Sequence, residues 1–185
     1  MILWILFILF SIPLMVISWR SLHHPRSHGF YRFFAWEAIL ALFLLNVGNW
    51  FDKPFAWFQI ISWSLLVLSL VLLAFGARAL RSQGKPAQQR EGDPALLAFE
   101  KTTRLVTTGI YRYIRHPLYG SLFLLTWGIF FKSPSLPEVI IAICASLFLI
   151  ATGKADELEC SQYFGAPYLE YRKRTKMFIP YLLGL

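Results

Sequence analysis

Charged residues are scarce in this sequence. Only 15% of its 185 residues are Asp, Glu, Lys or Arg, whereas 57% are hydrophobic, 17% are aromatic and the mean hydropathy is +0.53. A typical soluble domain carries about 25% charged residues. The composition therefore excludes an ordinary water-soluble globule and indicates a protein that lies in a membrane.

Cysteine is nearly absent: the chain has only Cys144 and Cys160. On one continuous helix they would lie about 24 Å apart, at about 1.5 Å per residue, which is too far for a disulfide. His23, His24 and His28 form a histidine-rich turn, but no cysteine or carboxylate joins them there. We therefore expect neither a redox pair nor a metal site.

Long apolar runs are what the sequence has in abundance. A membrane-spanning helix needs about 20 apolar residues, and five runs reach or approach that length, at 2–19, 30–50, 55–80, 118–132 and 136–153. The first run has no preceding positive charge and no small-residue cleavage site, so we expect a retained span and not a signal peptide. These runs predict an all-α, polytopic membrane protein with about five transmembrane helices and a C-terminal amphipathic cytoplasmic segment.

The basic residues follow the alternation of these runs. If the N-terminus lies outside, all eighteen Lys and Arg except Lys53 and Lys132 fall on inner segments. The positive-inside rule then predicts an outer N-terminus and a cytoplasmic C-terminus and inner loops. The net charge of +8 reflects this topology and an attraction to anionic membrane lipids, so we expect no nucleic-acid partner.

The chain divides into three parts by composition. Residues 1–81 form a three-helix membrane part, 82–104 a cytoplasmic loop rich in Gly and Pro at its start, and 105–185 a region with a membrane hairpin and a cytoplasmic tail. Within the loop, 95–101 is predicted to form a short interfacial helix.

Polar chemistry is concentrated where the 118–132 run begins. Arg115 and His116 precede Pro117, and the free N–H groups of a helix start there favour an anion such as a carboxylate. Asp156 and Glu157 follow the fifth run on the same inner side and suit an ammonium group. Together they predict a site for an amino-acid-like ligand. The alternative is that the arginines bind lipid phosphate and the acids are only solvated.

Three motifs carry a family resemblance: G-x-Y-x-x-x-R-H-P-x-Y-G at 109–120, the acidic pair at 156–157, and F-G-x-x-Y-x-x-Y at 164–171, followed by Ile-Pro. The region 103–183 resembles the isoprenylcysteine carboxyl methyltransferase family, which is grouped with integral-membrane phospholipid methyltransferases. The resemblance implies methyl transfer from S-adenosylmethionine to a lipidic or amphiphilic acceptor, namely an isoprenylcysteine carboxylate, a phospholipid amine or a small hydrophobic thiol. It implies that the cofactor is bound by Thr103, Arg104, Leu105, Val106, Tyr111, His116, Pro117, Leu118, Tyr119, Asp156 and Glu157.

The resemblance and the chemistry of the groups give Arg115 and Glu157 catalytic roles. Arg115 would orient an anionic acceptor or headgroup, and Glu157 or His116 would accept a proton from an amine. Three positions depart from the family pattern, and one of them is Thr103, which replaces a more usual polar ring residue. Asp156 stands where a glutamate is usual, and Thr152 stands where some members carry a substrate-binding arginine.

Two alternative functions stay open at this point. The C-terminal part of sterol reductases resembles the same RHP-x-Y pattern but holds NADPH, although this chain is short of spans for that family. A membrane scaffold that kept the fold and lost the chemistry is the other, and the intact motifs argue against it.

Overall fold

The computed structural model describes residues 2–84 and 102–178, and the regular elements in these ranges are helices. Four of them have the length and apolar composition to cross a membrane: α1 (Ile2–Leu22), α2 (His28–Asn46), α3 (Trp57–Gln83) and α5 (Leu136–Phe164). A shorter apolar helix, α4 (Pro117–Phe130), covers the fourth predicted run. The predicted all-α membrane architecture is therefore confirmed. The helix predicted at 95–101 lies outside the described residues.

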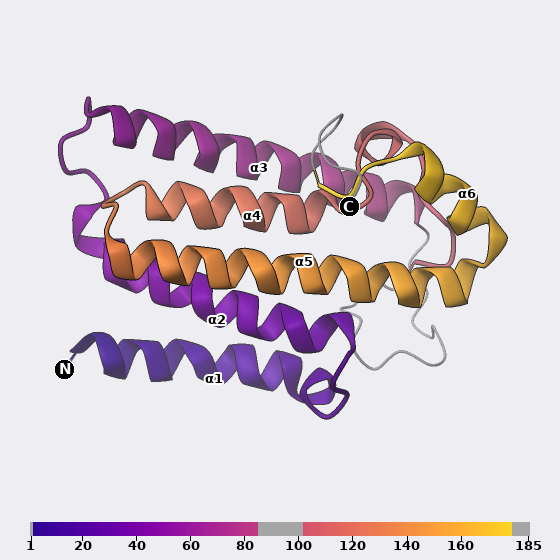
Figure 1. Ribbon diagram of the computed structural model, residues 1–185, viewed down its shortest axis with the longest axis horizontal. Coiled ribbons are helices and arrows are strands. Elements are labelled where there is room, and N and C mark those ends of the chain that lie inside the picture. The colour runs from indigo at the N-terminus through magenta and orange to yellow at the C-terminus, as the bar shows by residue number, and fades with distance from the viewer. Residues whose placement is uncertain (1, 85–101, 179–185) are drawn as a thin grey trace.

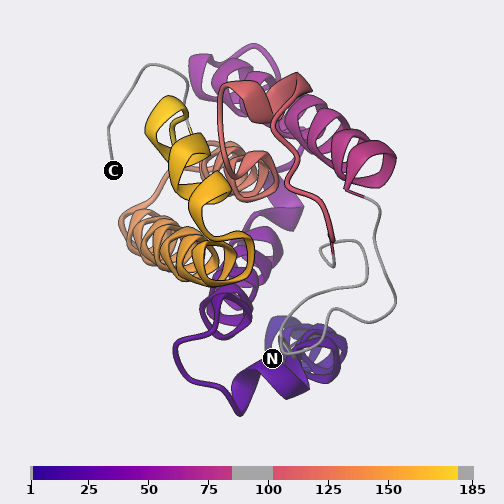
Figure 2. The same cartoon turned by 90° about the vertical axis from the view of Figure 1, so that its right-hand side faces the viewer.

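The long helices lie side by side along the bundle axis (Figures 1 and 2). The most extensive contacts join α2 to α5 and α3 to α4, and α1 packs on α2 at the edge of the bundle. The core between the four inner helices consists of Ile39, Leu42, Leu66, Ile129, Phe130, Ala142 and Ala145. Many apolar side chains of α1 and α3 point outward, as expected for helices in contact with lipid.

Small and hydroxyl residues bring α3 and α4 close together. Ser62 and Ser69 of α3 donate to the carbonyl oxygens of Gly128 and Ser121 in α4, at 2.6 and 2.7 Å. Interhelical hydrogen bonds and close backbone approach of this kind hold helices together in lipid, where the hydrophobic effect offers no preference for association.

At one end of the bundle, α4 stops short of its neighbours. Its 14 residues span about 21 Å, less than the roughly 30 Å hydrocarbon core. The next turn contains Lys132, whose buried ammonium donates to Gln59 Oε1 at 3.0 Å and lies 3.6 Å from the Trp63 ring centroid. These contacts satisfy a cation that would otherwise be costly to bury.

At the other end, α5 continues to Phe164, past the end predicted at 153, so the acidic pair stands on this same helix. Gly165 follows with φ +64° and ψ −138°, a conformation that glycine adopts without a Cβ clash. The chain reverses there into α6 (Ala166–Arg174).

The segment after α6 returns to the turn before α4. The backbone N–H groups of Arg115 and His116 donate to the carbonyls of Lys176 and Met177 at 2.8 and 3.1 Å. The Phe178 ring lies beside those of His116 and Phe123. The start of α4, the end of α5 and α6 therefore meet at one end of the bundle. The division into parts at 81 and 104 stays a prediction.

Candidate active site

The turn before α4 and the acidic pair of α5 are in direct contact. His116 Nδ1 lies 3.3 Å from Asp156 Oδ2, and His116 Nε2 lies 3.5 Å from Glu157 Oε1. The imidazole is buried and stacks near the Tyr119 ring, with centroids 5.5 Å apart. One histidine at the helix start thus faces both carboxylates, which lie 40 and 41 residues later in the sequence.

The guanidinium of Arg115 is held in place by contacts with other residues of the protein. Its guanidinium donates from Nε to Glu157 Oε1 at 2.7 Å, and its Nη2 lies 2.6 Å from the same oxygen. It also donates to the carbonyls of Arg172, at 3.2 Å, and Thr175. Arg172 adds a second ion pair to Glu157 Oε2 at 3.0 Å. Because a guanidinium has five donors in a rigid fork, it can join the turn, α5 and the end of α6 at one point.

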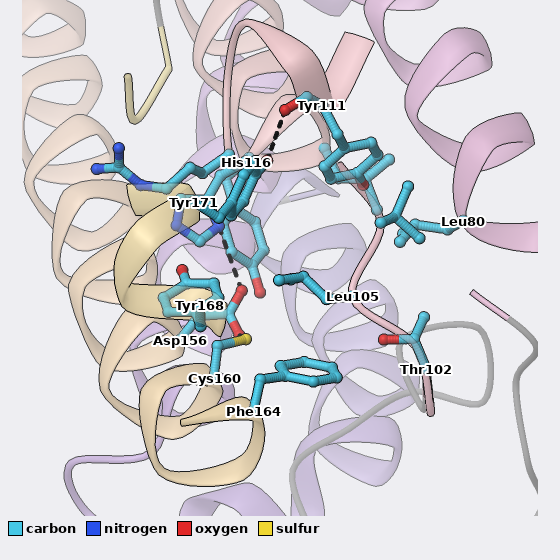
Figure 3. A pocket seen from close by; sticks show the side chains of 14 residues that line it. Leu80, Thr102, Leu105, Tyr111, His116, Asp156, Cys160, Phe164, Tyr168 and Tyr171 are labelled. Atoms are coloured by element: carbon cyan, nitrogen blue, oxygen red, sulfur yellow. Dashed lines mark hydrogen bonds and ion pairs between the residues drawn. The ribbon is translucent and has the colours of Figure 1, made fainter. Parts of the chain in front are cut away.

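A cavity of about 100 Å³ opens beside His116 (Figure 3). Its walls come from the end of α3, the 102–119 segment, the end of α5, and α6. The predicted site residues that line it are Leu105, Val106, Tyr111, Arg115, His116, Leu118, Tyr119 and Asp156.

The other predicted positions, Thr103, Arg104, Pro117 and Glu157, are not among the residues that line this cavity. Thr103 and Arg104 donate their backbone N–H groups to the Gly84 carbonyl, at 3.1 and 3.4 Å. Pro117 is buried in the first turn of α4, and Glu157 is buried against Arg115. Whether each contacts a ligand stays a prediction.

Sequence reasoning did not select several residues that line the cavity: Leu80, Thr102, Cys160, Phe164, Tyr168 and Tyr171. A spacing of four places Asp156, Cys160 and Phe164 on one face of a helix, so helical extension of the fifth run would have found two of them. Cys160 Sγ lies 3.4 Å from Asp156 Oδ1. The position of Tyr168 at the cavity depends on the chain reversal at Gly165, which a hydropathy pattern does not predict.

Two tyrosines of α6 differ in how their hydroxyls are satisfied. Tyr171 OH donates to the Tyr111 carbonyl at 2.7 Å. Tyr168 is only 3% exposed, and its OH makes no hydrogen bond with any described residue. His116 Nε2 also makes no hydrogen bond within the described residues, although Glu157 is near. Two buried polar atoms at this cavity are thus incompletely satisfied, which is uncommon in native structures.

Electrostatics keep His116 protonated more readily than usual. Burial by itself lowers the pKa of His116, but the adjacent carboxylates of Asp156 and Glu157 more than offset this, so its pKa lies above the ordinary 6.5. Burial raises the pKa of Tyr168, and neighbouring Cys160 acts in the same direction, so this phenol stays neutral. The site therefore combines an imidazole that favours its protonated form, two carboxylates and a neutral phenol.

The histidine-rich turn is divided in the structure. His23 and His24 pair through Nδ1 with backbone carbonyls one turn earlier, at 2.8 and 2.9 Å. His28 instead lies beside Asp156 and Glu159, with one ligand atom from each within 4.8 Å of the others. The His28 backbone N–H and imidazole both contact the Glu159 carboxylate. The fold thus brings two carboxylates to His28, which the sequence reasoning did not foresee, and the expected absence of a metal site stays a prediction.

Comparison with known proteins gives a family for this arrangement. The model of the phospholipid methyltransferase family matches residues 57–162. The chain belongs to this family. The matched range runs from α3 through α4 to the end of α5, and it includes His116 and both carboxylates that face it.

Curated relatives of this phospholipid methyltransferase family member fall into two groups. Methanethiol S-methyltransferase of Crocosphaera subtropica is 25% identical over 178 residues, which is 88% of this chain and 64% of the relative. Human protein-S-isoprenylcysteine O-methyltransferase is 28% identical over 127 residues, or 68% of this chain and 44% of the relative. The chain thus covers less than two thirds of either relative. No solved structure matches it.

Proposed function

We propose that this protein is a multi-pass membrane methyltransferase that transfers a methyl group from S-adenosylmethionine to a lipidic or amphiphilic acceptor. The observation that carries the proposal is the closure of the R-H-P turn on the acidic pair, with His116 within 3.5 Å of both Asp156 and Glu157, beside a cavity. Membership in the phospholipid methyltransferase family supports methyl transfer as the chemistry of this site.

The residues present fit the proposed methyl donor. The donor is a zwitterionic amino acid joined through a sulfonium to a nucleoside, and it supplies an electrophilic methyl group. Asp156 can accept from an ammonium or a ribose hydroxyl, and protonated His116 can donate to a carboxylate. The unsatisfied Tyr168 hydroxyl offers a further polar contact. Apolar walls from Leu80 and Val106 suit the uncharged part of a nucleoside.

The size of the cavity sets a condition on binding. About 100 Å³ is less than the roughly 300–1,000 Å³ of typical ligand pockets. A nucleotide-sized ligand must therefore either extend beyond the described walls or move them apart. Leu105 and Phe164 face each other across the cavity from separate elements (Figure 3), so a shift of the 102–108 segment would widen it.

In this proposal, some residues of the site touch the ligand and others hold those residues in position. Arg115 and Glu157 were predicted to be catalytic, and the contacts of Arg115 with Glu157 and with carbonyls at the end of α6 favour a positioning role for the pair. His116 and Asp156, which line the cavity, are the groups that we expect to touch a ligand. If the acceptor is an amine, the nearby carboxylates offer a place for its proton.

The names of the relatives do not decide whether the methyl acceptor is a thiol or a carboxylate. Outward apolar side chains are frequent along α1 and α3, so we propose that an acceptor with a hydrocarbon portion reaches the cavity from the membrane. We also propose that the N-terminus lies outside and that the site faces the cytoplasm, because inner segments carry almost all Lys and Arg.

Binding of radiolabelled S-adenosylmethionine to the purified protein tests the proposal. We expect binding by the wild type and a loss of about tenfold or more for Asp156→Asn or His116→Ala, because each removes a charge-assisted contact worth about 1.5–3 kcal/mol. Glu170→Gln is the matched control, since Glu170 is exposed on α6 and pairs only with Lys173 among the described residues. It should bind like the wild type.

A wild-type protein that does not bind S-adenosylmethionine would refute the proposed cofactor. Binding of NADPH in the same assay, with loss in His116→Ala, would favour the reductase alternative. Binding of the methyl donor without methylation of any lipid or thiol in a membrane extract would favour a non-catalytic scaffold.

A further inference from the structure

Tyr168 combines deep burial with an unused hydroxyl. The side chain is 3% exposed and lines the cavity, and its OH has no hydrogen-bond partner among the described residues. Leaving a buried hydroxyl unsatisfied costs about 1–3 kcal/mol. A phenylalanine would fill the same space without that cost. The Tyr168 hydroxyl could therefore form a hydrogen bond with a ligand that enters the cavity.

The neighbours of Tyr168 indicate what the ligand would present. Tyr168 lies beside Asp156 and Cys160 at the junction of α5 and α6 (Figure 3). Its phenol is neutral, because burial raises its pKa, and a neutral phenol can both donate and accept. Next to a carboxylate, it suits a polar group that Asp156 also binds, such as an ammonium or a hydroxyl.

Tyr171 provides the internal comparison. It stands three residues later on the same helix and lines the same cavity, but its OH donates to the Tyr111 carbonyl at 2.7 Å. That bond ties α6 to the segment before α4. One tyrosine hydroxyl is thus used in the scaffold, whereas the other is buried in a residue of the cavity wall and has no partner among the described residues.

We infer that the Tyr168 hydroxyl is a contact for the methyl donor, on the side held by Asp156, and that it sets the affinity for the donor without contributing to the stability of the protein. This inference rests on the proposed function. Tyr168 belongs to the F-G-x-x-Y-x-x-Y motif, but the inference depends on which hydroxyl lacks a partner and not on the motif.

Calorimetric titration of the purified protein with S-adenosylmethionine and S-adenosylhomocysteine, in the absence of an acceptor, tests the inference. Tyr168→Phe should weaken the binding of both by about 3- to 10-fold, the effect of one hydrogen bond. Its melting temperature without ligand should equal or exceed that of the wild type. Tyr171→Phe should melt lower than the wild type, because it removes the hydrogen bond between α6 and the Tyr111 carbonyl.

Tyr113→Phe is the matched control for binding, because Tyr113 is close in sequence to the site but exposed and absent from the cavity wall. It should bind both ligands like the wild type. Unchanged affinity of Tyr168→Phe would overturn the inference while leaving the proposed function intact. So would a melting temperature lowered as far as that of Tyr171→Phe, since the hydroxyl would then have a structural partner. Failure of the wild type to bind either compound refutes the proposed function itself.

Discussion

At His116, burial and neighbouring charge act on one imidazole in opposite directions. Burial favours the neutral ring, and the carboxylates of Asp156 and Glu157 favour the charged one. The carboxylates prevail because they lie within 3.5 Å on two different ring nitrogens. Arg115 takes part of the charge of Glu157, so Asp156 is the principal partner of the protonated imidazole.

This balance predicts that the protein loses stability as the pH rises. The pKa of His116 is raised in the folded protein, so its contribution to the free energy of unfolding is complete below the unfolded value of about 6.5. It should decline as the pH rises from there through the folded pKa. Melting temperatures of wild type and His116→Gln across this range should converge at high pH. A difference that stays constant with pH would contradict the prediction.

Individual site residues were predictable where a motif names them. His116 and Asp156 are brought together as the amino-acid-like site required. The motif does not say which of its residues contact the rest of the protein instead of a ligand. The guanidinium of Arg115 binds Glu157 and carbonyls near the end of α6. These partners are known only once the chain after Gly165 is placed. For the same reason, no local pattern distinguishes the hydroxyl of Tyr168 from that of Tyr171.

At the scale of the helix, close approach of α3 and α4 depends on residues without bulk. A Cβ added at Gly128 would lie 2.9 Å from Leu66 Cδ2 and 3.3 Å from the Leu66 backbone nitrogen. The side chain can rotate away, but the backbone of α3 cannot move without disturbing the Ser62 hydrogen bond to the Gly128 carbonyl. This contact therefore fixes the distance between the two helices.

Gly128→Ala is accordingly expected to destabilise the protein. Alanine gains roughly 1 kcal/mol of helix propensity, but overpacking of a close contact costs about 1–3 kcal/mol, so we expect a net loss of about 1 kcal/mol. Gly48→Ala is the control, because a Cβ at Gly48 meets nothing within 4 Å. Circular dichroism melts in one detergent should place Gly128→Ala below the wild type and Gly48→Ala at or above it. The reverse order would rule out this account of the contact.

Helix positions were largely predictable, and helix ends were less so. Each of the five apolar runs corresponds to a helix, because hydrocarbon demands long apolar segments, and four of these helices are long enough to be candidate membrane spans. The end of α5 was predicted at 153, but the helix continues to Phe164, because charged residues end an apolar run without ending a helix. That extension carries Asp156 and Cys160 to the cavity. The stop itself is local, at the positive φ of Gly165.

The whole molecule has two chemically different ends. One has Lys132 enclosed by Gln59 and Trp63 near the start of α3, and the other has the cavity beside Leu80 near the end of α3. Most Lys and Arg residues lie in the sequence segments that the predicted topology assigns to the cavity end of the bundle. A charged nucleotide does not cross hydrocarbon unaided, so the proposed methyl donor requires that the cavity end face the compartment that supplies it.

This asymmetry predicts the orientation in the membrane. In a background with Cys144 and Cys160 replaced by Ser, we would introduce Asp52→Cys in the exposed turn before α3 and Lys173→Cys on the exposed face of α6. A membrane-impermeant maleimide should label Asp52→Cys in intact cells, and Lys173→Cys only after permeabilisation. Because the positive-inside rule acts through Lys and Arg near the span ends, the two sites must respond oppositely. Labelling of Lys173→Cys in intact cells would place the cavity outside and contradict the proposed source of the methyl donor.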